Sequence, residues 1–429
     1  MRHNRDDLQR EVREFVLDGF VPQYDQLADK FPSNPLWQQL RRLGSDLWLD
    51  SGNIEEIASL WTREFTAVTT NNTLLNREIQ TGVYDRLIGE ASALLDDFDL
   101  SPREKMLEIA FILNARHGLR LVEQFDAMVS VEEHTDLAHD VQGAVDYGLR
   151  YWDICPRRFI IKIPLTPAGL LATWQLVRQG VRVNHTLGFS ARQAFLVAKV
   201  ARPNYVNVFL GRLNSYVADS KLGDGQMVGE KAALSAQSAI ESLRSDDPQL
   251  VTRQIGASCR QGSQIASLAG MDVLTIPPKV AKEFLDLEIS ADDLRVQSVE
   301  EMQPQFAAGI DEKSTALDTL WGIHERLYDA VEELSARDLS SFTPRDVVDY
   351  FNARGCRGLF VVWTAEEVAA SADEGKIPKY ARWKDDLASG RVGLDALMNL
   401  AGLNSFATDQ RAMDDRVTDV LARQWASRK

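Results

Sequence analysis

The chain has 429 residues and carries a formal net charge of −15 at pH 7. This excess of carboxylates repels polyanions, so the charge argues against nucleic acids and anionic membrane surfaces as general partners. An anionic small molecule would need a local cluster of basic side chains to overcome the repulsion. No stretch approaches the roughly 18 consecutive apolar residues of a membrane span, so we expect none.

The cysteines and the amino-terminal residues indicate a cytoplasmic protein. Cys155, Cys259 and Cys356 are few and unpatterned, which suits a reducing cytosol. Residues 1–10 are densely charged and lack the apolar stretch of a secretory signal. With 45% hydrophobic residues, the chain can bury a large core, as one α/β domain with additions or as two domains.

Residues 6–44 have the mixed-charge pattern of a helix and precede a series of short apolar runs. Segments with helical periodicity separate these runs. Because strands that alternate with helices favour a (β/α)8 TIM barrel, we predict this α/β fold for residues 46–285. A doubly wound open sheet is the alternative, but no Gly-rich phosphate-binding turn follows a first strand. The runs predict strands over Leu47–Leu49, Phe65–Thr69, Ala127–Val131, Phe159–Ile163, Val181–Asn184, Tyr205–Phe209, Gln254–Ala257 and Val273–Ile276, and the separating helices include Asn76–Leu95, Pro102–Asp126 and Pro167–Gln179.

Helical additions are expected at both ends of the barrel. Residues 1–45 are expected to form an amino-terminal helical extension. Residues 286–400 are expected to form a mostly helical insertion or subdomain, and residues 401–429 a final helix that packs on the barrel. Within the insertion, the patterns predict helices over Ala316–Ser335 and Pro344–Ala353, a strand-like run over Gly358–Trp363 and a charged segment over Asp373–Asp386.

A lysine stands in the middle of one apolar run, Phe159-Ile-Ile-Lys162-Ile-Pro164. Strands that are apolar on both faces are typical of parallel sheets buried between two layers. Burial removes the hydration of an ammonium group and favours the neutral amine. A neutral amine is the nucleophile that Schiff-base chemistry with a carbonyl substrate requires. The alternative is a lysine with a buried stem whose head group reaches water at the strand end.

Polar residues stand at or just after the ends of the other runs. The catalytic groups of a TIM barrel lie at the carboxyl ends of its strands, so we expect these residues to meet around the lysine. They are Asp50, Asn71, Glu132, Asn184, Arg212 and Ser258.

Two segments beside the lysine have a distinctive order of residues. Residues 162–170 read Lys-Ile-Pro-Leu-Thr-Pro-Ala-Gly-Leu, and residues 183–194 read Val-Asn-His-Thr-Leu-Gly-Phe-Ser-Ala-Arg-Gln-Ala. They resemble the transaldolase family, whose Schiff-base lysine lies in an IKIPAT-x-x-G strand followed by an N-x-T-L-x-FS-x-x-QA strand. The resemblance covers residues from about 45 to 285 and the last helix. Other segments in the family's order are Asp50-Ser-Gly-Asn-Ile, Val68-Thr-Thr-Asn71, Val129-Ser-Val-Glu132, Phe209-Leu-Gly-Arg212, Ile255-Gly-Ala-Ser258-Cys-Arg260, Leu268-Ala-Gly-Met-Asp272 and Phe406-Ala-Thr-Asp-Gln410.

The resemblance implies a catalytic group centred on the lysine. Lys162 would attack the donor ketone, and Glu132 and Thr186 would hold the water that shuttles protons. Asp50 would take and return the proton of the substrate hydroxyl beside the scissile carbon–carbon bond. A carboxylate in an apolar barrel mouth, with its pKa raised by burial, suits such acid–base work. The alternative roles are a buried ion pair between Glu132 and Lys162 and, for Asp50, a helix cap.

The resemblance also implies the groups that hold the substrate. Asn71 and Asn184 would bind substrate hydroxyls; the alternative is that they form hydrogen bonds with backbone groups of the loops. Asn207 stands where the family commonly has serine and would point a larger side chain with two donors into the site. Phe209 stands where transaldolases have phenylalanine and fructose-6-phosphate aldolases have tyrosine, whose hydroxyl can hold a hydrolytic water. The family's TTNP reads Thr-Thr-Asn-Asn72 here, which loses the proline.

Arg212, Ser258 and Arg260 correspond to the family's anion clamp. Arginine binds phosphate through its planar fork, and serine adds a donor. The clamp would follow the sixth and seventh strands, whereas many barrels bind phosphate after the last two. It would supply the local positive charge that the acidic chain otherwise lacks. The alternative for each arginine is a surface ion pair.

The implied activity is that of a transaldolase-like transferase in the pentose phosphate pathway. A dihydroxyacetone unit would move from fructose 6-phosphate or sedoheptulose 7-phosphate to an aldose phosphate. No metal or organic cofactor is expected, because the protonated imine is the electron sink, and His134 and His139 lack metal-ligand spacing. The alternatives are a fructose-6-phosphate-type aldolase, a transaldolase for an unusual, for example sulfonated, ketose, and a non-catalytic phosphosugar-binding barrel. The partners would be small sugar phosphates, and both a monomer and a homodimer stay open.

Overall fold

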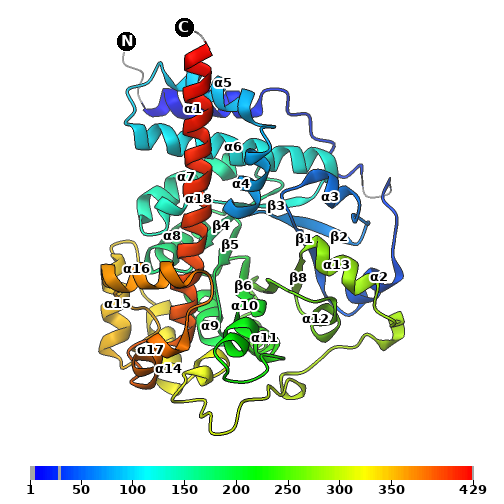
Figure 1. The fold of residues 1–429 in the computed structure, drawn as a ribbon, viewed down its shortest axis with the longest axis vertical. Helices are drawn as coiled ribbons and strands as arrows, with labels where there is room; N and C mark the ends of the chain where they lie inside the picture. Colours follow the sequence, from blue (N-terminus) through cyan, green and yellow to red (C-terminus); the bar gives the residue numbers. More distant parts are fainter. Residues whose placement is uncertain (1–4, 28–29, 428–429) are drawn as a thin grey trace.

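A computed structural model describes residues 5–27 and 30–427, which contain a closed barrel of parallel strands surrounded by helices (Figure 1). The strands pair in chain order, and β1 pairs with β8 to close the barrel. The predicted (β/α)8 fold is therefore confirmed. The strands are β1 Asp46–Asp50, β2 Phe65–Thr69, β3 Met128–Glu132, β4 Phe159–Pro164, β5 Val183–Thr186, β6 Tyr205–Phe209, β7 Arg253–Ala257 and β8 Val273–Ile276.

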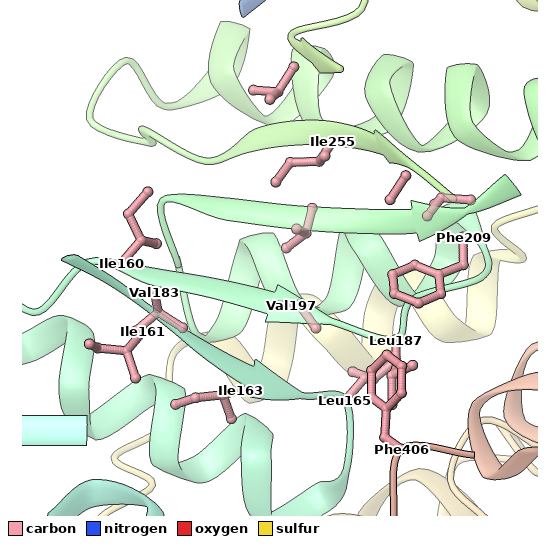
Figure 2. Close-up of a cluster of buried hydrophobic side chains, with 14 of the residues drawn as sticks. Ile160, Ile161, Ile163, Leu165, Val183, Leu187, Val197, Phe209, Ile255 and Phe406 are labelled. Carbon is pink, nitrogen blue, oxygen red and sulfur yellow. The ribbon is translucent and has the colours of Figure 1, made fainter. Parts of the chain in front are cut away.

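The strands form where the sequence runs apolar because both of their faces are covered by protein. In β4, Figure 2 shows Ile160 on one side of the strand and Ile161 and Ile163 on the other. The outer side faces the helices, since the Phe159 ring packs against Gly118 of the long helix that precedes β3. Successive side chains alternate between faces, so Lys162 joins Ile160 inside the barrel.

Helices follow each strand, and several of them start at clear capping signals. The helix after β4 is an example, because Thr166 Oγ1 accepts a hydrogen bond from the backbone N–H of Gly169 at 2.8 Å and Pro167 opens the first turn. The helices are α1 Arg5–Leu17, α2 Pro35–Arg42, α3 Ile54–Ala58, α4 Asn72–Gln80, α5 Asp85–Leu95, α6 Pro102–Phe125, α7 Val141–Ile154, α8 Pro167–Arg178, α9 Ala191–Val200, α10 Leu210–Asp219, α11 Val228–Asp246, α12 Gly262–Ser267, α13 Pro278–Leu285, α14 Glu325–Ser335, α15 Pro344–Ala353, α16 Ala365–Glu374, α17 Tyr380–Ala388 and α18 Leu394–Ser427, with short 3-10 helices η2 Thr135–Leu137, η3 Ala291–Asp293, η4 Val299–Glu301 and η5 Leu317–Leu320.

Two predicted helices are interrupted. The helix predicted over residues 6–44 is wrong as one element, because α1 ends at Leu17 and α2 begins at Pro35, with Pro22 and Pro32 between them. The helix predicted over Asn76–Leu95 is divided into α4 and α5, and Gly82 takes a φ of +87° between them.

Residues 286–400 also differ from the prediction in two places. The run Gly358–Trp363 is not a strand, since Gly358 makes a single bridge with Val392 and the closed barrel offers no free edge. The helix predicted over Ala316–Ser335 consists of η5 followed by α14. The helix predicted over Pro344–Ala353 forms as α15.

The carboxyl-terminal helices lie along one side of the barrel and across its mouth (Figure 1). α14 packs on α9, α15 packs on α8, and α16 packs on α18, while α18 continues onto α4 and α5. The start of α18 is fixed by a buried ion pair, in which Arg192 Nη2 lies 2.6 Å from Asp395 Oδ1. Ser190 Oγ donates to the same carboxylate at 2.6 Å. None of the helices in the described residues has the length and apolarity needed to cross a membrane.

Candidate active site

A cavity of about 780 Å³ opens at the carboxyl ends of the strands, where TIM barrels place their chemistry. Two predicted site residues, Glu132 and Thr186, are buried inside the barrel and contact lining residues instead of the cavity. The other predicted site residues all line it, namely Asp50, Asn71, Lys162, Asn184, Asn207, Phe209, Arg212, Ser258 and Arg260.

The amine of Lys162 lies in the deepest polar part of this cavity. Lys162 is 4% exposed, so its head group does not reach bulk water at the strand end. Its Nζ donates to the backbone carbonyl of Thr70 at 3.2 Å and lies 3.8 Å from Glu132 Oε1. Glu132 of β3 is the register partner of Lys162 on β4, so the barrel itself sets this pair. The Phe406 ring of α18 lies 5.7 Å from Nζ and limits access of water.

Two carboxyl groups flank the amine, and burial raises the pKa of both. The Lys162 charge opposes the rise for each. Glu132 Oε2 accepts a hydrogen bond from the backbone N–H of Asn72 at 3.1 Å. Asp50 Oδ1 accepts one from Thr69 Oγ1 at 2.8 Å. Such carboxyl groups hold a proton to higher pH than solvent-exposed carboxyls do, which suits them to acid–base work.

Amide side chains occupy the adjoining wall. Asn207 Nδ2 donates to Thr186 Oγ1 at 2.9 Å and to Asn184 Oδ1 at 3.3 Å. The Asn207 donors are therefore used within the protein, while its buried Oδ1 has no partner in the described residues. Asn184 Nδ2 donates to Ser130 Oγ at 3.1 Å. Asn71 caps α4 through Oδ1, which accepts from Leu74 N at 2.9 Å.

Aromatic rings close the cavity beside the amides (Figure 2). Phe209 ends β6, and its ring centroid lies 5.8 Å from that of Phe189 and 6.3 Å from that of Phe406. Figure 2 shows Phe406 reaching from α18 towards Phe209 and Leu187. The side of the site near Phe209 therefore offers an apolar surface in place of a hydroxyl.

Basic side chains also line the cavity. Arg212 is buried, its guanidinium lies over the Phe209 and Phe406 rings, and its Nη1 has no hydrogen-bond partner in the described residues. Burial and the charge of Arg260 lower the pKa of Arg212 to about 10, so it stays protonated at neutral pH. Gly211 allows the close approach, because a Cβ there would stand 2.2 Å from the Ser258 carbonyl oxygen.

Three further cations line the same cavity, and the sequence analysis missed all of them: Lys376, Arg77, and Lys279, whose Nζ lies 3.6 Å from Glu283 Oε1. Lys376 lies on the loop between α16 and α17, and Arg77 lies on α4. Burial and the charges of Arg260 and Arg212 lower the pKa of Lys376. Lys376 falls in a segment without resemblance to the family, and an exposed helical arginine gives no local signal. Only the folded arrangement of the chain brings Lys376 and Arg77 to the same cavity.

Four of these basic groups have no ion-pair partner. Within the described residues, Arg77, Arg212, Arg260 and Lys376 have no carboxylate oxygen within 4.0 Å of a side-chain nitrogen. The Asp409 charge acts on both Arg212 and Lys376, and the Glu132 charge also acts on Arg212. Unpaired cations clustered in a chain of net charge −15 indicate a site for an anion.

The closed barrel with a polar cavity at its strand ends is the arrangement of a TIM-barrel enzyme. The family model for transaldolase/fructose-6-phosphate aldolase matches residues 47–336, which is most of the chain. The chain belongs to the transaldolase/fructose-6-phosphate aldolase family. The match runs from β1 to the helix α14, past the limit of residue 285 expected from the motifs.

Curated relatives agree with this assignment. A transaldolase of Rhizobium etli is 29% identical over 285 residues, which cover 64% of this chain and 85% of the relative. A transaldolase of Xanthomonas euvesicatoria is 30% identical and covers 58% and 77%. A probable transaldolase of Thermus thermophilus is 32% identical and covers 56% and 90%. The predicted family and enzyme class are confirmed.

Proposed function

We propose that the protein transfers a dihydroxyacetone unit from a ketose phosphate to an aldose phosphate through a Schiff base on Lys162. Fructose 6-phosphate and sedoheptulose 7-phosphate are the expected donors, in the carbohydrate chemistry of the pentose phosphate pathway. The observation that carries the proposal is the buried amine, held 3.8 Å from Glu132 in a cavity that Arg212 and Arg260 also line. Membership of the family supports it.

In the first half-reaction, Lys162 Nζ adds to the donor ketone, and the carbinolamine then loses water to give a protonated imine. Glu132 supplies and removes the protons through a water held with Thr186. Asp50 takes the proton of the hydroxyl beside the scissile bond, and the bonding electrons move into the imine as the carbon–carbon bond breaks. The aldose phosphate leaves, and an enamine remains on Lys162.

In the second half-reaction, the enamine carbon attacks the carbonyl carbon of the acceptor aldehyde. Asp50 returns its proton to the new hydroxyl, and water then hydrolyses the imine to free Lys162 and the product ketose. The protonated imine accepts the bonding electrons when the carbon–carbon bond breaks, and the enamine returns them when the new bond forms. The two half-reactions therefore need no metal or organic cofactor.

The substrate phosphate is assigned to Arg212, Ser258 and Arg260, with Lys376 at the rim. Arg212 Nη1 is a buried donor without a partner, and a phosphate oxygen would satisfy it. The same group lets the site hold phosphorylated sugars against the repulsion of the acidic chain.

The hydroxyls of the bound sugar are assigned to Asn71, Asn184 and Asn207. Asn207 would contribute its free Oδ1 as an acceptor, since its amide donors already bind Thr186 and Asn184. The donor sugar that fits best is one with a hydroxyl placed to donate a hydrogen bond to Asn207 Oδ1. Phe209 adds no hydroxyl beside the catalytic water, which favours capture of the enamine by an acceptor over hydrolysis.

The test measures dihydroxyacetone release from fructose 6-phosphate with and without erythrose 4-phosphate. Slow release without acceptor and fast transfer with it are expected. Phe209→Tyr should shift the balance towards release, because positioned acid–base groups contribute roughly 10²- to 10⁴-fold and partial gains are measurable. Rapid release that ignores the acceptor would make the protein an aldolase. A sulfonated ketose is the comparison donor if neither sugar phosphate reacts.

A further inference from the structure

The loop between β2 and α4 contacts both members of the Lys162–Glu132 pair. The carbonyl of Thr70 accepts a hydrogen bond from Lys162 Nζ at 3.2 Å. Two residues later, the backbone N–H of Asn72 donates to Glu132 Oε2 at 3.1 Å. One short segment therefore offers an acceptor to the amine and a donor to the carboxylate, and both contacts come from its backbone.

Asn72 departs from the TTNP segment of the family that the sequence resembles. Proline at this position has no N–H, so it could not make the contact to Glu132. The Asn72 side chain is buried and points elsewhere, since its Nδ2 donates to the carbonyl of Glu133 at 3.0 Å. The asparagine therefore makes two separable contacts, one through the backbone and one through the side chain.

We propose that the backbone N–H of Asn72 is a positioning group that orients Glu132 and stabilises its charged form during proton transfer. This inference rests on the proposed role of Glu132 and deepens it. Asn72 is the first residue of α4, and the first N–H groups of a helix lack partners within the helix. A carboxylate is the group that such a donor and the helix terminus favour.

Other charges act on Glu132 as well and have to stay constant in a test. Burial raises its pKa, and the Lys162 charge, the Asn72 N–H and Arg212 lower it, while the Asp50 charge raises it. Glu133 is the buried carboxyl that directly follows β3, and the Glu132 charge acts on it. A change at position 72 that leaves these groups in place isolates the N–H.

The structure allows such a change. The first turn of a helix accepts proline well, because the missing N–H is one of the orphan donors. The preceding residue, Asn71, is already extended, with φ −159° and ψ 170°, which is close to the conformation that a following proline favours. Asn72→Pro therefore fits the first turn of α4 and removes both the N–H and the side-chain contact to Glu133, whereas Asn72→Ala removes only the side-chain contact. The difference between the two variants reports the effect of the N–H.

The experiment compares the pH dependence of kcat/KM for the intact protein and the two variants. A hydrogen bond to a carboxylate lowers its pKa by roughly one unit or somewhat more. Asn72→Pro should therefore raise the pKa of Glu132, and with it the acidic limb of the pH profile of kcat/KM, by about one unit. At a pH below that limb, the rate should fall about 10-fold, with little change well above it. Asn72→Ala should follow the intact protein.

A second readout separates this inference from the proposed function. The carbon-13 signal of the Glu132 carboxyl, assigned with Glu132→Gln, reports its pKa whether or not the protein turns over. An upward shift in Asn72→Pro alone supports the inference, even if no transfer activity is found. Equal pKa values in all three proteins, or equal shifts in both variants, would overturn it. Lactate at position 72 has the methyl side chain of alanine and an ester oxygen in place of the N–H, so its comparison with Asn72→Ala gives the same test if the proline variant folds poorly.

Discussion

The positive charges on the floor of the cavity, at Lys162, and on its rim, at Arg260 and Lys376, lie in different surroundings. On the floor, Lys162 is 4% exposed and has a carboxylate at 3.8 Å and a carbonyl at 3.2 Å. At the rim, Arg260 and Lys376 are exposed to solvent and form no ion pair within the described residues. The strand register fixes the floor, while loops and a carboxyl-terminal segment supply the rim.

The difference indicates that the floor and the rim have separate roles, in the chemical step and in substrate binding. A buried amine next to a carboxyl of raised pKa is suited to the chemical step, because that carboxyl can take up and release protons beside it. Exposed cations without partners stay charged and attract anions, which is a task of recognition. Changes on the floor should therefore act on the chemical step, and changes at the rim should act on the binding of phosphate.

The largest expected effect tests the floor directly. Lys162→Ala should lower kcat by on the order of 10⁴-fold or more, because no other group can form the imine. The fold should persist, since Glu132 can take up a proton when its partner is lost. Lys199→Ala is the control, because Lys199 makes a surface ion pair with Glu332 away from the cavity. Residual turnover in Lys162→Ala close to that of the control would contradict the account.

The second prediction compares Glu132, which contacts Lys162 on the floor, with Glu133, which follows it in the sequence and faces Gly148 of α7. Glu132→Gln should lower kcat by about 10²- to 10⁴-fold, the usual contribution of a positioned acid–base group. Glu133→Gln is a matched control, since Glu133 is also buried with a raised pKa but does not contact Lys162 Nζ. Steady-state rates at several pH values measure the difference. Equal losses in both variants would mean that Glu132 is structural.

The third prediction moves to the clamp. Arg260→Gln and Arg212→Gln should each lower kcat/KM for fructose 6-phosphate by about 10- to 100-fold, as charge-assisted contacts to phosphate are lost. Unphosphorylated fructose should be affected much less. Arg212→Gln should cost more, because Arg212 is buried with an unpaired Nη1. The same loss for both sugars would show that the arginines act on the fold instead.

The smallest effect is expected at the outer rim. Lys376→Gln should raise the KM for fructose 6-phosphate by about 3- to 10-fold and leave kcat nearly constant, as an exposed charge contributes modestly. Lys379→Gln is the control on the same loop, because it changes the net charge equally and Lys379 does not line the cavity. Inhibition by inorganic phosphate should weaken in Lys376→Gln only. Identical KM values in the two variants would remove Lys376 from the site.

Most of the barrel could be predicted from the sequence because its strands are buried on both faces and run apolar. The bounds of β2, β6 and β8 agree with the predicted runs. The structure of residues 358–363 was harder to predict. Gly358–Trp363 has the apolar pattern of a strand, but the barrel is closed and offers no free strand edge with which it could pair. Local pattern cannot report whether an edge is free.

The site could be predicted where a residue ends a strand and not where it comes from elsewhere. Lys162 and Asp50 lie on strands whose register brings them to one mouth. Lys376 reaches the cavity through a loop far along the chain. The contact of the Asn72 N–H with Glu132 depends on backbone geometry at a helix start, which residue types alone do not specify.

The central claim is that Lys162 forms a covalent imine with a ketose phosphate. Borohydride treatment in the presence of fructose 6-phosphate, followed by peptide mass mapping, tests it most directly. The account predicts a reduced adduct on the peptide that contains Lys162 and no adduct in Lys162→Ala. An adduct on another lysine, or trapping that persists in Lys162→Ala, would contradict it.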